Sequence, residues 1–301
     1  MEKGMTMTNN ASRIALLGGD TRQIFTARKL IEDGYSVSAW GLGDLKAQGL
    51  DSVACTDWRD AVMDAEILLL PLPVSADGVR LNCPLQRPEE SVRLSLLPTL
   101  FGGKLLLGGK IPPALCSLAE EKGIACIDYF DSELLQLKNA LPTVEGALFV
   151  AMGELSVPLD GAEIAVIGYG RIGSLLGKRL TALGARVYAV TRSPEKLAAA
   201  FCDGCIPFGT ERLSECISIS DAVFNTAPAT VLDKERLPYI SKGCPVIDLA
   251  SAPGGVDTEE AKRLGIKVIW ALSLPGKYSP KTAASIIADA VREHFDRTRN
   301  R

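Results

Sequence analysis

Short apolar runs alternate with stretches of helical periodicity along most of the chain, a pattern typical of parallel sheets covered by helices on both faces. The pattern predicts helices over 22–33 and 112–121. Strands are predicted at 14–17, 35–40, 66–70, 104–107 and 124–127 in the first half, and at 163–167, 186–190, 222–224, 245–249 and 267–270 in the second. An α/β fold with two parallel-sheet domains follows, since 301 residues are enough for two cores.

Proline and glycine positions divide the chain into four parts. A first α/β domain is expected over 1–141, and a connecting helix over 142–158, where TVEGALFVAMGEL has helical spacing between Pro142 and Pro158. The second domain is expected over 159–276. A terminal helix, within 277–301, should pack back onto the first domain, because a long helix after the last strand needs an apolar partner.

The clearest motif is GYGRIG after the strand at 163–167, with Gly168, Gly170 and Gly173 in GxGxxG spacing around Arg171 and Ile172. The first glycine allows a tight turn, the second lets a pyrophosphate approach the backbone, and the third allows close helix packing. Strand, turn and helix follow in the required order, so we expect a dinucleotide site rather than a structural glycine turn. The fold expected is thus two Rossmann-like domains with an interdomain cleft, joined by long helices.

The end of the next strand bears on the choice of dinucleotide. NAD sites place a carboxylate there for the ribose 2′-hydroxyl, whereas this chain has Thr191, Arg192 and Ser193, with Lys196 one turn later. Arg192 can pair with a 2′-phosphate, which favours NADP, with NAD possible. The alternative is that Arg192 and Lys196 form a solvated helix start.

Two further loops follow predicted strands of the second domain. Small residues in these loops would let the nicotinamide ribose lie against backbone, although ordinary turns rich in Pro and Gly would look the same. The cofactor-binding candidates here are Thr226, Ala227, Pro228, Ala250 and Ser251.

Composition excludes several classes of function. A balance of 33 basic and 36 acidic residues, net −3, argues against nucleic-acid or anionic-membrane partners. The single histidine, His294, argues against a metal site and against a histidine relay, and we read it as a surface residue. Eight scattered cysteines, including the Cys202 and Cys205 pair, are interpreted as structural thiols of a cytoplasmic protein, and no signal peptide or membrane span is predicted.

Five motifs in order resemble the A subunit of dipicolinate synthase. They are GGDTRQ (18–23), NALPTVEGAL (139–148), GYGRIG (168–173), DLASAPGG (248–255) and LPGKYSPKTAA (274–284). The two-domain plan is also similar, more distantly, to 2-hydroxyacid and alanine dehydrogenases. The resemblance implies oxidation of a dihydrodipicolinate, or its hydrated precursor, to dipicolinate with NADP during sporulation. It also implies the flavoprotein-like B subunit of dipicolinate synthase as partner, and we expect a homo-oligomer.

A small dicarboxylate substrate calls for cations, hydroxyls and helix N-termini. The binding candidates are Gly19, Arg22, Lys104, Thr143 and Lys277, although each basic residue could equally be a solvated surface charge. For proton removal the candidates are Asp20 and Glu145, with water as a substitute, and Asp20 could instead cap its helix.

Two rival functions stay open. A 2-hydroxy or 2-amino acid dehydrogenase normally pairs a catalytic histidine with a carboxylate, which the position of His294 does not favour. A non-catalytic NADP-binding protein that scaffolds its partner is the other.

Overall fold

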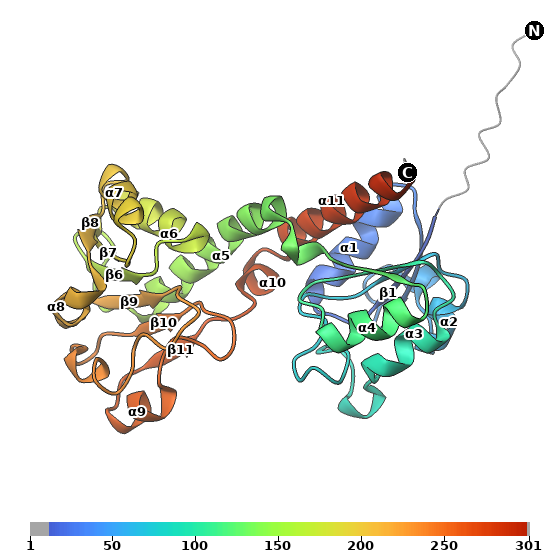
Figure 1. Ribbon diagram of the computed structural model, residues 1–301, viewed down its shortest axis with the longest axis horizontal. Helices are drawn as coiled ribbons and strands as arrows, with labels where there is room; N and C mark the ends of the chain where they lie inside the picture. Colours follow the sequence, from blue (N-terminus) through green and yellow to red (C-terminus); the bar gives the residue numbers. More distant parts are fainter. Residues whose placement is uncertain (1–11, 300–301) are drawn as a thin grey trace, which may run out of the picture. The chain divides into compact units, whose positions relative to one another are not determined.

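The structure, a computed structural model, describes residues 12–299 and contains two compact units. The described part of the first unit consists of residues 12–136 and 280–299, and the second consists of residues 137–279 (Figure 1). Each unit has one parallel sheet covered by helices.

The first unit has a five-stranded sheet in the order β2-β1-β3-β4-β5, with every neighbouring pair parallel. Its strands are β1 (Arg13–Leu17), β2 (Ser36–Trp40), β3 (Ile67–Leu69), β4 (Leu105–Gly108) and β5 (Ala125–Asp128). Its helices are α1 (Thr21–Glu32), α2 (Trp58–Met63), α3 (Leu97–Leu100), α4 (Pro113–Glu121) and α11 (Pro280–Arg299). The central strands are buried on both faces, which explains their continuous apolar runs.

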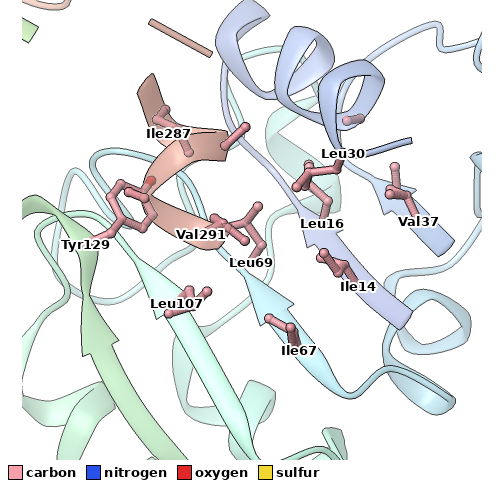
Figure 2. Packing of buried hydrophobic residues seen from close by; sticks show 14 of the residues in the cluster. Ile14, Leu16, Leu30, Val37, Ile67, Leu69, Leu107, Tyr129, Ile287 and Val291 are labelled. Carbon is pink, nitrogen blue, oxygen red and sulfur yellow. The ribbon is translucent and has the colours of Figure 1, made fainter. Parts of the chain in front are cut away.

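The last helix, α11, completes the core of the first unit. Its apolar face, with Ile287 and Val291, packs among Leu16, Leu30 and Leu69 from α1 and the sheet (Figure 2). Ile287 is 3% exposed and Val291 is 0% exposed. The first unit therefore depends on residues from both ends of the chain.

The second unit has a six-stranded parallel sheet in the order β11-β10-β9-β6-β7-β8. Its strands are β6 (Glu163–Ile167), β7 (Arg186–Val190), β8 (Ile206–Phe208), β9 (Ala222–Asn225), β10 (Val246–Asp248) and β11 (Val268–Trp270). Its helices besides α5 are α6 (Arg171–Ala182), α7 (Pro194–Cys202), α8 (Leu213–Ser218), α9 (Thr258–Arg263) and α10 (Leu274–Tyr278). The apolar pattern did not predict β8.

The helix expected to connect the two domains is longer than the predicted range. It is α5, which covers Glu133–Glu154 and contains Pro142 in its interior. A proline removes one helical hydrogen bond and strains the turn before it, but the turns on either side are long enough to continue. The boundary between the two units falls inside this helix, after Gln136, and the second unit ends at Ser279.

Two kinds of feature are absent from the part of the chain that the structure describes. Within residues 12–299 no helix is long and apolar enough to cross a membrane. In the same range no group of three or more His, Cys, Asp or Glu side chains is placed to hold a metal. All eight cysteines are free thiols.

Candidate functional site

The glycine turn between β6 and α6 has the geometry that its sequence predicts. Gly168 has φ +88°, and a Cβ there would lie 2.6 Å from the Thr226 hydroxyl. A Cβ on Gly173 would lie 2.0 Å from the Gly168 carbonyl oxygen, so the helix could not approach the strand this closely with any other residue. A Cβ on Gly170, by contrast, would meet nothing within 4 Å, which leaves the backbone open to a bulky ligand.

The start of α6 offers backbone donors beside this turn. Gly170 is the N-cap residue and supplies no side-chain hydrogen bond, so the first N–H groups of this 12-residue helix, from Arg171, Ile172 and Gly173, point toward the open side. Tyr169 fixes the turn from below: it is buried, and its hydroxyl donates to Asp203 at 2.9 Å. Burial raises the pKa of Tyr169, so the phenol stays protonated and keeps this bond.

At the carboxyl end of β7, Thr191 is buried and Arg192 is exposed. The Arg192 guanidinium forms no hydrogen bond or ion pair with any residue in the range 12–299. Ser193 caps α7, accepting from the Lys196 N–H at 3.3 Å and donating to Glu195 at 2.5 Å. That hydroxyl lowers the pKa of the Glu195 carboxyl. The sequence interpretation overlooked this carboxylate.

A buried polar pair joins the loops after β9 and β10. The Asn225 amide donates to Asp248 at 2.8 Å, and Asp248 also accepts from the N–H groups of Ala250 at 3.0 Å and Gly255 at 2.8 Å. Asn225 is 0% exposed and Asp248 is 3% exposed. Both lie in loops that the sequence singled out, but their role is to hold the loops together.

The candidate cofactor residues therefore gather at one edge of one sheet. The Thr226 hydroxyl donates to the carbonyl oxygens of Ile167 and Gly168, at 3.0 and 3.1 Å, and so ties the loop after β9 to the glycine turn. Ala227 beside it is half-buried, and Pro228 and Ser251 are exposed. All the candidates follow the carboxyl ends of β6, β7, β9 and β10, which is where open α/β sheets bind ligands.

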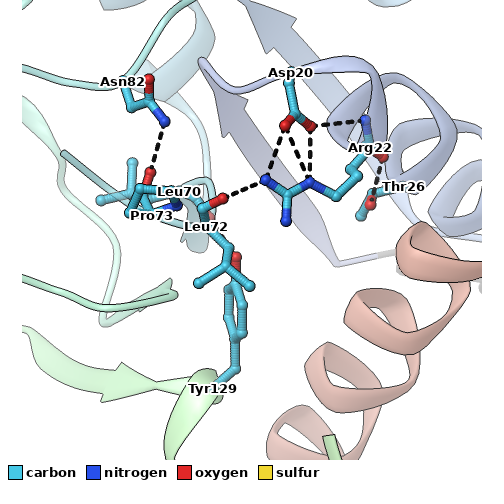
Figure 3. A network of polar contacts seen from close by, with 8 residues as sticks. All are labelled: Asp20, Arg22, Thr26, Leu70, Leu72, Pro73, Asn82 and Tyr129. Carbon is cyan, nitrogen blue, oxygen red and sulfur yellow. Dashed lines mark hydrogen bonds and ion pairs between the residues drawn. The ribbon is translucent and has the colours of Figure 1, made fainter. Parts of the chain in front are cut away.

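The first unit has a second glycine turn, between β1 and α1. Asp20 caps α1 by accepting from the Arg22 N–H at 3.0 Å, and its two oxygens also accept from Nε and Nη2 of Arg22, at 2.9 and 2.8 Å (Figure 3). Arg22 is 6% exposed, and its Nη2 also donates to the Leu72 carbonyl oxygen at 2.5 Å. Among residues 12–299 nothing accepts from Nη1, so one edge of the guanidinium remains for a ligand.

This turn differs from the one in the second unit because another segment lies on it. The Gly19 N–H donates to the Asn82 carbonyl oxygen at 2.8 Å. A Cβ on Gly18 would lie 2.7 Å from Cys83 Sγ. The neighbouring Gln23 is 1% exposed, and neither of its amide atoms has a hydrogen-bond partner within residues 12–299. The space that a pyrophosphate would need is filled with protein here.

The other predicted residues are dispersed. Lys104 precedes β4, so it lies at the amino edge of the sheet, opposite Arg22, and the structure does not bring these two cations together. Thr143 lies ten residues into α5, not at its head, and its hydroxyl donates to the Asn139 carbonyl oxygen at 2.7 Å. Glu145 is exposed on α5, and Lys277 is exposed on α10.

His294 is half-buried on α11 rather than fully exposed. Cys205 of the CxxC pair is buried, with its sulfur 3.7 Å from the Tyr169 hydroxyl, and Cys202 is exposed.

Comparison with known proteins identifies the family. A family model for the N-terminal domain of the dipicolinate synthase A subunit matches residues 13–130. The chain is 31% identical over 282 residues to the A subunit of dipicolinate synthase from Bacillus subtilis (strain 168), covering 93% of this chain and 94% of the relative. The chain belongs to the family of dipicolinate synthase A subunits.

Solved structures of the family agree with the fold. The A chain of dipicolinate synthase from Bacillus subtilis has a TM-score of 0.83 at 28% identity, covering 97% of this chain and 98% of that one. The A subunit from Bacillus halodurans has a TM-score of 0.81 at 25% identity, covering 94% and 97%. A second family model, D-isomer specific 2-hydroxyacid dehydrogenase, NAD binding domain, matches residues 149–252, which contain the open glycine turn. The protein is thus an oxidoreductase of the nicotinamide dinucleotide type, with two Rossmann-like parallel-sheet domains.

Proposed function

We propose that this chain oxidises dihydrodipicolinate, or its hydrated precursor, to dipicolinate, with NADP preferred to NAD. The observation that carries the proposal is the 31% identity, over 93% of the chain, to a protein named as the A subunit of dipicolinate synthase. The reaction removes a hydride and a proton from a dihydropyridine ring, and aromatisation of the product favours it. A bound nicotinamide dinucleotide supplies the hydride acceptor.

The residues of the second unit fit such a cofactor. The open backbone at Gly170 and the uncapped start of α6 would hold the pyrophosphate. Arg192, which is exposed and has no protein partner within residues 12–299, would bind the 2′-phosphate, assisted by Lys196. Glu195 lies one turn away, and its bond from Ser193 holds the carboxylate in place. The paired loops after β9 and β10 would support the nicotinamide ribose.

The first unit would hold the dicarboxylate. Arg22 is already neutralised by Asp20 and fixed by Leu72, so its free Nη1 would orient a carboxylate without searching for a conformation. Both Asp20 oxygens accept from Arg22, which makes Asp20 a poor proton acceptor. We therefore favour Glu145, which is exposed and has no hydrogen-bond partner within residues 12–299, or solvent water.

We also propose a flavoprotein-like second subunit of the synthase as partner, and action in the cytoplasm of a sporulating cell. Both proposals rest on the relative's name, which makes it one lettered component of a larger synthase.

A steady-state assay tests the reaction. Enzymatically generated dihydrodipicolinate is supplied with NADP or NAD, and reduced cofactor and dipicolinate are followed by absorbance. We expect equal amounts of the two products, and a higher kcat/KM with NADP. D-lactate and L-alanine serve as control substrates for the rival dehydrogenase function. Turnover of either control but not of dihydrodipicolinate would refute the proposal, and activity that appears only with the second subunit present would support the scaffold alternative.

A further inference from the structure

Two residues other than glycine have positive φ within the described part of the chain, Lys110 at +54° and Ser273 at +57°. Lys110 lies two residues beyond the end of β4, at the carboxyl edge of the first sheet. The left-handed conformation strains a side chain that glycine would lack. Glycine occupies the two preceding positions, Gly108 and Gly109, yet lysine occupies the strained one.

The surrounding structure holds Lys110 in this conformation. The Asp128 carboxylate, at the end of the neighbouring β5, accepts from the N–H groups of Lys110 at 3.1 Å, Ile111 at 2.8 Å and Phe130 at 2.8 Å. Three backbone bonds to one carboxylate fix the loop after β4 to the end of β5. The strain is thus built into a well-anchored loop.

The same loop is tied to the site of Arg22. The Gly109 N–H donates to the Pro71 carbonyl oxygen at 3.1 Å, and a Cβ on Gly109 would lie 2.6 Å from the Leu72 side chain. Leu72 in turn accepts from Arg22 through its carbonyl oxygen. Since β1, β3 and β4 are consecutive in the sheet, Arg22 and Lys110 lie on either side of the loop after β3, at one edge.

The ammonium group is suited to an anionic ligand. Lys110 Nζ lies 5.2 Å from the centre of the Phe130 ring, a weak contact that a carboxylate can replace. Partial burial lowers the pKa of Lys110, although the Asp128 charge opposes this shift. A partly desolvated cation binds a carboxylate more strongly than a fully hydrated one.

We propose that Lys110 is the second cation of the substrate site and binds one carboxylate of a pyridine dicarboxylate, while Arg22 binds the other. The inference rests on the proposed function, because it takes the substrate class from there. Lys110 is then a specificity-determining residue for ligands with two carboxylates over ligands with one.

Binding of two probes tests this assignment. Calorimetric titrations of the full chain, with NADP present, compare pyridine-2,6-dicarboxylate with pyridine-2-carboxylate. We expect Lys110→Gln to weaken binding of the dicarboxylate by roughly 10- to 100-fold, and of the monocarboxylate far less. Lys110→Arg should retain most of the preference. Lys122→Gln, an exposed lysine after α4 in the same unit, is the matched control and should bind both probes like the unaltered chain.

Lys110→Gly separates ligand binding from folding. It removes the side chain and also the strain, so we expect a higher melting temperature together with the same loss of preference. If Lys110→Gln or Lys110→Gly kept the preference for two carboxylates, the inference would be overturned alone. If the unaltered chain bound neither probe, the proposed function would fail, and the inference with it.

Discussion

Single residues distinguish the glycine turn of the first unit from that of the second. Both units have a strand, a turn with positive-φ glycine and a 12-residue helix. In the first unit Asn82 and Cys83 lie directly on the turn, whereas in the second Gly170 faces open space. The first turn instead carries Arg22, with one edge of its guanidinium available. Two similar backbones are thus suited to different anions, a carboxylate and a pyrophosphate.

Arg192 provides a test of cofactor choice at the residue scale. We expect Arg192→Gln to weaken NADP binding by roughly 10- to 100-fold and NAD binding by less than about threefold, because only NADP has the 2′-phosphate. Fluorescence titration with the reduced cofactors measures both affinities.

Arg186→Gln is the matched control, since Arg186 begins the same strand, β7, whose carboxyl end Arg192 follows. Arg186 pairs with Glu163 at 2.9 Å at the amino edge, away from the glycine turn, and its replacement should leave both affinities unchanged. Equal losses for the two cofactors in Arg192→Gln would contradict the 2′-phosphate role.

At the scale of elements, α11 illustrates how distant segments form one core. Ile287 on α11 is 3% exposed among side chains from β1, α1 and β3. Ile287→Ala should lower the free energy of unfolding of the first unit by about 2–5 kcal/mol through lost burial and a cavity. Urea unfolding followed by tryptophan fluorescence reports on this unit, because Trp40 and Trp58 are both buried there.

Ile31→Ala on α1 is the matched control for that variant. Ile31 is 38% exposed, so we expect a loss of about 1 kcal/mol or less. Similar losses for the two variants would show that α11 is not part of this core.

The sequence was informative about elements where apolar periodicity dominates. The strand predicted at 186–190 is β7, and the helix predicted at 112–121 is α4 (Pro113–Glu121). It did not predict β8, because three residues with Pro207 in the middle resemble a loop. Such a strand is tolerated because β8 is at the edge of its sheet, where a missing N–H leaves no neighbour unpaired. Pro142 likewise suggested a helix boundary, but α5 continues through it.

The candidate site was predictable where a motif fixes the backbone and not where tertiary contacts choose a side chain. GYGRIG locates the open turn because each glycine answers a steric demand. Lys104 and Lys110 flank the same short strand, and composition does not distinguish them. Strand direction does, because it places Lys110 at the carboxyl edge with Arg22 and Lys104 at the other. The strain at Lys110 and its fixation by Asp128 come from the folded loop alone.

At the scale of the whole molecule, the two units are expected to divide the ligands between them. Hydrogen–deuterium exchange of the full chain tests this division, since a ligand slows exchange of the amides that it covers. NADPH should protect residues 168–174 and 191–196, around the open turn and the end of β7. Pyridine-2,6-dicarboxylate should protect residues 18–23 and 108–112. In Lys110→Gln the second pattern should weaken while the first persists, because the cofactor residues lie in the other unit. Protection of 18–23 by NADPH alone would contradict the argument that Asn82 and Cys83 close that turn to a pyrophosphate.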